Sequence, residues 1–145
     1  MEGCGIILCI DDKGRGHFYA CEWKDGFPIN EGVHIMTDDQ WHKFEGPHDA
    51  QLYLTGHGRM TVEDGAEYIG EWKESKFHGQ GILKKRNGWS YFGTWKENDK
   101  HGEGIQTETN GDYYQGLWSE NEKVQPISKQ GKERGLTLTK KQSKK

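Results

Sequence analysis

Residues 56–124 read GHGRMTVEDGAEYIGEWKESKFH, GQGILKKRNGWSYFGTWKENDKH and GEGIQTETNGDYYQGLWSENEKV when the chain is divided every 23 residues. The three copies align without insertion or deletion, and six positions are the same in all of them. These positions are two opening glycines (Gly56 and Gly58, Gly79 and Gly81, Gly102 and Gly104), a central glycine (Gly65, Gly88, Gly111) and the motif Tyr-x-Gly-x-Trp (Tyr68, Gly70, Trp72; Tyr91, Gly93, Trp95; Tyr114, Gly116, Trp118). A fixed period of this length is typical of stacked repeats.

Each copy predicts a β-hairpin. The pairs Asp64-Gly65, Asn87-Gly88 and Asn110-Gly111 fall at one phase of the repeat. Asx-Gly between extended segments is the strongest local signal for a tight turn with positive φ. In the strand that follows, Tyr68, Gly70 and Trp72 share one face because side chains alternate. The glycine leaves a slot for a ring of a neighbouring strand, and its recurrence favours this structural role over close approach of a ligand.

The motif Tyr-x-Gly-x-Trp, a short polar turn and then His-Gly-x-Gly (residues 78–81 and 101–104) resembles the MORN repeat, the membrane occupation and recognition nexus. The resemblance implies an all-β fold: an elongated antiparallel ribbon of consecutive hairpins with little helix, which serves as a scaffold or interaction module. About ten short strands are expected. The family favours glycine three residues after the tryptophan, where this chain has Ser75, Asn98 and Asn121. Asparagine tolerates the left-handed region better than serine, so we expect a looser turn at Ser75.

Residues 1–55 are interpreted as two degenerate copies, residues 56–124 as three regular repeats and residues 125–145 as a basic tail that is disordered when free. In the first degenerate copy, residues 17–26 overlay residues 66–75, which puts Cys21 at the slot position. The segment 10–16 is read there as a longer hairpin loop. The second copy opens near Gly32, runs to Gly46 and carries His48 in place of the tryptophan. A hinge or bulge is expected at residues 47–55.

The composition fits a thin repeat better than a thick globular core. Of the 145 residues 31% are apolar and the mean hydropathy is −1.05, yet there are 21 glycines, six Trp, six Tyr and five Phe. The three cysteines are odd in number, and no signal peptide or long apolar run is apparent. We therefore expect a cytoplasmic protein. A setting in the cytoskeleton or in a cilium or flagellum is a separate expectation.

The charge is unevenly distributed along the chain. Residues 125–145 hold seven Lys or Arg and one Glu, a net charge of +6, whereas the rest holds 13 basic and 22 acidic residues, a net charge of −9. Lysine clusters are attracted to anionic lipid. The alternative lipid or polyanion site of this tail comprises Lys140, Lys141, Lys144 and Lys145.

Neither catalysis nor metal or cofactor binding is expected. His78 and His101 recur once per hairpin instead of converging, and Cys4, Cys9 and Cys21 form no Cys-x-x-Cys pair. The recurrent glutamates lie beside tryptophans or in turns, as on a solvated face, and the Gly-x-Gly pairs lack the Gly-Lys-Ser/Thr of a phosphate loop.

Three functions from different classes remain: a non-enzymatic adaptor that binds a protein in a cytoskeletal, ciliary or axonemal assembly, a peripheral membrane binder that uses the basic tail, and an accessory domain of an enzyme. The first is preferred. Self-association through a sheet edge is also expected, because residues 3–9 read GCGIILC and an open apolar edge invites strand addition. No nucleic-acid partner is expected.

The expected partner-binding residues are Trp89, Phe92 and Phe77. Trp89 directly follows the Asn87-Gly88 turn, where the flanking copies have Ala66 and Asp112, so the repeat does not require an aromatic residue there. Tryptophan at an exposed tip is enriched among residues that carry binding energy. The alternative is that Trp89 folds back on Phe92 or on a neighbouring hairpin.

Overall fold

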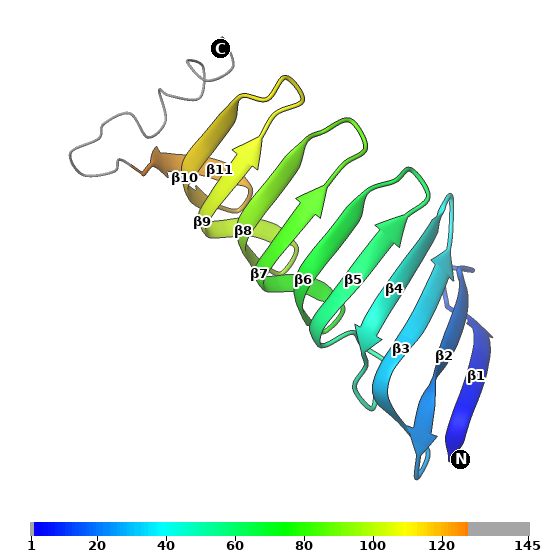
Figure 1. Cartoon of the computed structure of the whole chain (residues 1–145). Helices are drawn as coiled ribbons and strands as arrows, with labels where there is room; N and C mark the ends of the chain where they lie inside the picture. Colours follow the sequence, from blue (N-terminus) through cyan, green and yellow to red (C-terminus); the bar gives the residue numbers. More distant parts are fainter. Residues whose placement is uncertain (1, 128–145) are drawn as a thin grey trace.

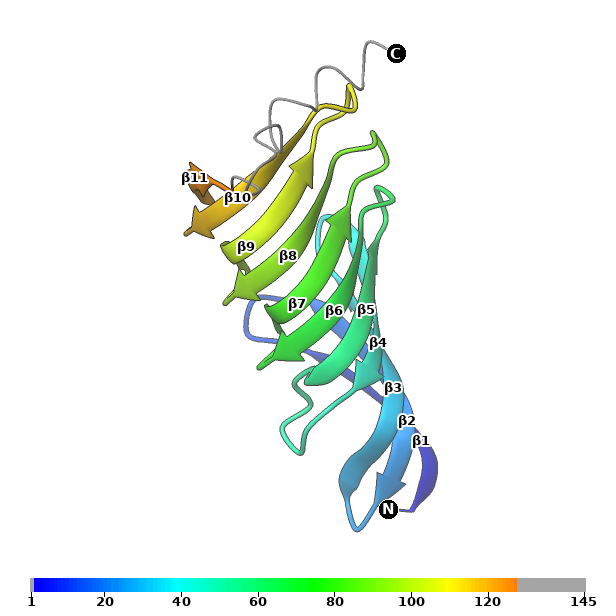
Figure 2. The same ribbon diagram turned by 60° about the vertical axis from the view of Figure 1, so that its left-hand side comes forward.

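The structure is a computed structural model that describes residues 2–127, and this part of the chain is one antiparallel sheet of 11 strands without a helix (Figure 1). Strands that follow one another in sequence lie side by side, which confirms the predicted meander of hairpins. The strands are β1 (Gly3–Ile10), β2 (Gly16–Lys24), β3 (Phe27–Thr37), β4 (Trp41–Pro47), β5 (Gly56–Val62), β6 (Glu67–Lys73), β7 (Lys76–Lys84), β8 (Ser90–Lys96), β9 (Asp99–Thr107), β10 (Tyr113–Ser119) and β11 (Glu122–Pro126). The second view shows that the ribbon twists along its length (Figure 2).

The Asx-Gly pairs make the turns at one long edge of the ribbon. Gly65 has a φ of +89°, and its N–H donates to Val62 O at 2.8 Å. The Asp64 carboxylate accepts a hydrogen bond from the Ala66 N–H at 2.8 Å. The same bonds recur around Gly88 and Gly111, whose φ angles are +92° and +89°. These turns confirm the prediction of positive φ at Asx-Gly.

Two-residue turns close the hairpins at the other edge, and both residues of each turn have positive φ. They are Glu74-Ser75, Glu97-Asn98 and Glu120-Asn121. Each turn docks on the preceding repeat: Ser75 N–H donates to Leu54 O at 3.0 Å, and Ser75 Oγ accepts from Leu54 N–H at 2.9 Å. Asn98 makes the same pair of bonds with Phe77. The expectation of a looser turn at Ser75 is therefore wrong, because its hydroxyl does what the asparagine amide does.

A line of paired glycines crosses the sheet and lets each hairpin bend. From β5 to β10 the line is Gly58, Gly70, Gly81, Gly93, Gly104 and Gly116, each opposite the next. The register shifts just beyond it, for example between Gly70 and Glu71, and the two-residue ends of the later hairpins curl over one face (Figure 1). The slot for a neighbouring ring was predicted at Gly70, which is wrong, because a Cβ there would meet the backbone of Gln80 and Gly81. The Tyr68 ring lies instead against Gly81, the facing glycine of β7, where a Cβ would be 2.5 Å from Tyr68 Cζ.

The first hairpin differs from its expected form. Its turn has the bonds of a regular turn, with Asp11 N–H donating to Arg15 O at 3.0 Å and Gly14 N–H to Asp11 O at 3.0 Å. The four extra residues lengthen the ladder instead, because β1 and β2 pair without interruption from Gly3 and Trp23 to Ile10 and Gly16. The expected longer loop is therefore wrong.

The other sequence-based boundaries are placed as follows. In the second degenerate copy Gly32 pairs with Gly46, Phe44 is buried at the tyrosine position and His48 is 7% exposed at the tryptophan position. Residues 48–54 form a short loop closed by a bridge between His48 and Leu54. The predicted tail begins at residue 125, but residues 125 and 126 still belong to β11. The rest of the tail from residue 128 on, with its four candidate lysines, lies outside the described residues.

Candidate functional site

One face of the ribbon is a closed layer of rings. Tyr68 is 0% exposed and is covered by three rings: Phe77 stacks on it at 3.8 Å between centroids, while Trp72 and Trp95 meet it edge to face at 5.1 and 5.7 Å. Its hydroxyl donates to Glu71 O at 3.0 Å. Burial, followed by the charge of Glu71, raises the pKa of Tyr68. This face is used for the protein's own packing.

Toward β11 the ring layer contains a lysine where the preceding repeat has a phenylalanine. At the place of Phe77 the next repeat has Lys100, whose Nζ lies 4.2 Å from the Trp118 ring centroid and 5.6 Å from that of Tyr91. The ammonium donates to Gln106 Oε1 at 2.6 Å. Burial, followed by repulsion from Lys123, lowers the pKa of Lys100. Cation–π contacts thus replace the apolar stack in this repeat.

Trp89 lies on this ring face, half-buried against the core cluster. The ammonium groups of Lys85 and Lys100 lie 5.1 and 5.6 Å from its ring centroid. This arrangement matches the alternative in which the side chain packs on a neighbouring hairpin. Phe77 likewise lies within the layer, stacked on Tyr68.

Replacing Trp89 by alanine should therefore lower the free energy of unfolding. Two cation–π contacts of ~0.5–1 kcal/mol each predict a loss of about 1–2 kcal/mol. Chemical denaturation of the wild type and Trp89→Ala measures it. If Trp89→Ala left the free energy of unfolding unchanged but weakened partner binding, Trp89 would be a binding residue and not a packing residue.

Phe92 lies on the opposite face and is 54% exposed. It pairs across the strands with Ile82 on one side and Ile105 on the other, and Ile82 pairs in turn with Ile69. We call this set of four the back-face row. A hollow of about 210 Å³ lies beside it, bordered by Phe92, Ile105 and Ile127. Sequence reasoning named only Phe92; the phase shared by Ile69 and Phe92, between Tyr and Gly, would have indicated a second member.

The edge strand β1 carries a second apolar surface. Ile6, Leu8 and Ile10 share one side of the strand and are 62%, 75% and 75% exposed. Leu8 pairs with Phe18, which pairs with Ile35 on β3. Self-association through this edge stays a prediction.

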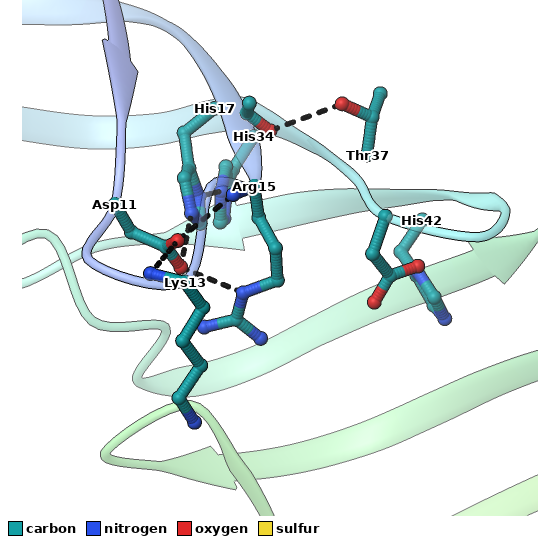
Figure 3. A network of polar contacts seen from close by, with 9 residues as sticks. Asp11, Lys13, Arg15, His17, His34, Thr37 and His42 are labelled. Carbon is teal, nitrogen blue, oxygen red and sulfur yellow. Dashed lines mark hydrogen bonds and ion pairs between the residues drawn. The ribbon is translucent and has the colours of Figure 1, made fainter.

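Histidines gather at the opposite end of the ring layer from Lys100. His17, His34 and Phe44 follow one another across the strands with centroid separations of 5.2 and 5.1 Å. Asp11 and Arg15 join this group from the β1–β2 loop (Figure 3).

Among residues 2–127, no three or more His, Cys, Asp or Glu side chains are grouped so that they could hold a metal ion. No helix in this range could cross a membrane.

The comparisons with known proteins agree with the geometry of the repeats. The MORN repeat family model matches residues 68–90 and 91–113, two adjacent units that each run from the motif tyrosine through the two-residue turn to the next Asx-Gly turn. A search of curated proteins found no match. MORN repeats are commonly involved in protein or membrane interactions. Residues 68–113, which carry the glycine line and the ring layer, are therefore two MORN repeats.

Proposed function

We propose that this chain is a non-enzymatic adaptor that binds a protein partner along its back-face row, within a cytoskeletal or ciliary assembly. The supporting observation is that the row is apolar although none of its residues belongs to the core cluster of rings. The rings and glycines that join the repeats all lie on the other face, and the equivalent of Phe92 in the next repeat is Gln115.

The chemistry of the row suits a protein surface. Phe92 exposes more than half of its side chain, while Ile69, Ile82 and Ile105 are half-buried beside it. Polar groups border the row, for instance Gln80, whose amide donates to Thr94 Oγ1 at 2.8 Å. An aromatic anchor within an apolar strip and a polar rim is the usual anatomy of a protein interface.

The variant Phe92→Gln tests this proposal, because it gives the middle repeat the residue that the last repeat already has. We expect thermal stability to stay near that of the wild type and partner affinity to fall by ~2 kcal/mol or more, as at a hot spot. Proximity labelling with both forms in the native cell identifies the partner, and calorimetry with the purified partner measures the affinity.

His57→Gln is the matched control, since His57 is exposed on the same face of β5 but outside the row. Equal labelling by the wild type and Phe92→Gln would contradict the row as the binding surface. Labelling that contains no cytoskeletal or ciliary protein would contradict the setting. Flotation with anionic vesicles that depends on residues 125–145 would favour the membrane-binding alternative.

A further inference from the structure

The first hairpin is tied to β3 by a chain of three side chains (Figure 3). Asp11 Oδ2 lies 3.1 Å from His17 Nε2, and His17 Nδ1 lies 2.9 Å from His34 Nε2. Asp11 also accepts hydrogen bonds from the Arg15 side chain at 2.6 Å and from the backbone N–H of Lys13 and of Arg15 at 2.9 Å each. Partial burial opposes ionisation, yet the bonds from Arg15, His17 and Lys13 hold the pKa of Asp11 well below its usual range. Asp11 is therefore a carboxylate.

The contact between the two rings has room for one proton. With neutral rings, His17 Nε2–H donates to Asp11, so His17 Nδ1 accepts from His34 Nε2–H. If His17 gains a proton, it forms an ion pair with Asp11 and its Nδ1–H donates to His34. If both rings are charged, two N–H groups face each other at 2.9 Å and the bond is lost.

His34 is poorly placed to take that second proton. It is 8% exposed and lies between the stacked rings of Tyr19 at 4.1 Å and Phe44 at 5.1 Å. The titratable and charged groups around it are His17, Tyr19, Asp11 and Arg15 from the first hairpin and His48 and Tyr53 from the segment after β4. Burial, followed by the charges of His17 and His48, lowers the pKa of His34 to about 3.

We propose that the Asp11–His17–His34 chain is an acid-sensitive lock that fastens the β1–β2 hairpin to the ribbon, and that a second proton releases this hairpin while the regular repeats stay folded. The residue opposite the motif tyrosine is His34 in the first copy, Leu83 in the third and Gln106 in the fourth. Neither of the latter two side chains titrates, so the lock belongs to the first hairpin.

The direction of the pH dependence follows from the burial of His34. The pKa of His34 is lower when the hairpin is closed than when it is open, so the open hairpin binds more protons. The contribution of neutral His34 to the stability of the closed hairpin is therefore complete above the ordinary histidine pKa of about 6.5. It is lost as the pH falls below that value. For one proton, the equilibrium constant for closing falls about tenfold per pH unit.

Hydrogen exchange of the full chain between pH 7.5 and 5 tests the lock. Protection factors, which correct for the intrinsic pH dependence of exchange, should fall about tenfold per pH unit below 6.5 in residues 3–24. Those of β6 to β9 should stay constant. Ring ¹⁵N shifts should show His34 neutral at pH 5.5 with the bond to His17 intact. A charged His34 ring at that pH would overturn the proposal.

The variant His34→Leu places the residue of the third copy at this site and removes the titrating ring. The protection of residues 3–24 should then no longer depend on pH between 7.5 and 5. His34→Gln, which introduces the residue of the fourth copy, serves the same purpose if leucine disturbs the stack. His57→Gln, which removes an exposed histidine, should keep the wild-type pH dependence. An unchanged pH dependence in both His34 variants would assign the effect to other groups and refute the lock.

Discussion

Replacing Gly93 by valine is expected to lower the free energy of unfolding by about 3 kcal/mol, the upper end of the ~1–3 kcal/mol typical of overpacking. A Cβ at this position would lie 2.5 Å from both Glu103 O and Gly104 Cα and 2.9 Å from the Tyr91 hydroxyl. Two of these three atoms belong to the backbone of β9, so no rotation of a side chain can relieve the overlap. The cross-strand pairing of Gly93 with Gly104 must open, and with it the bend of the hairpin.

The control is Ser90→Val on the same strand, where the side chain is half exposed on the other face. This change introduces the same β-branched side chain at a half-exposed strand position and should be nearly silent. Denaturant titration and thermal melting of the two variants decide the matter. Equal melting temperatures would show that the glycine line tolerates side chains.

The repeat and its turns could be predicted because their determinants are local. Asx-Gly and Tyr-x-Gly-x-Trp contain both the turn and the face on which the rings lie. The covering of Tyr68 by Trp95 depends instead on how far each hairpin end curls, which involves the register shift after Gly70 and contacts between repeats. The period shows that the units stack, but it does not show which ring covers which.

The first hairpin shows a second limit of the sequence. Four extra residues can enter a loop or extend a ladder, and the period cannot distinguish the two. Lys13-Gly14 stands in the same turn position as Asp64-Gly65, so a turn signal was present for the shorter loop. The alternating apolar residues Ile6, Leu8 and Ile10 agree with the longer strand.

The candidate surface was only partly foreseen for a similar reason. The sequence predicts Phe92 as a partner-binding residue, but the back-face row exists because Ile69, Ile82, Phe92 and Ile105 are cross-strand partners. Such partners come from the register, which the sequence does not state. For Trp89 the sequence allows an exposed tip or a ring that folds back on a neighbouring hairpin, and the structure places the ring against the core cluster with Lys85 and Lys100 over it.

Replacing Tyr68 by alanine should have the largest effect of all, a loss of ~3–5 kcal/mol, as for large aromatic side chains removed from a core. The ring is fully buried, and its removal would leave a cavity between Phe77, Trp72 and Trp95, which come from two successive repeats. Because repeat proteins are stabilised by contacts between neighbours, the loss should separate the melting of residues before β6 from that of the later strands.

The matched control is Tyr68→Phe, since Phe44 already occupies the equivalent position one copy earlier. This change removes only the hydrogen bond from the hydroxyl to Glu71 O, a net contribution of about 1 kcal/mol. Calorimetry should therefore show a small shift for phenylalanine and a large one, with a second transition, for alanine. If alanine cost no more than phenylalanine, the hydroxyl and not the ring would be holding the repeats together, and the ring layer could not be the source of the ribbon's stability.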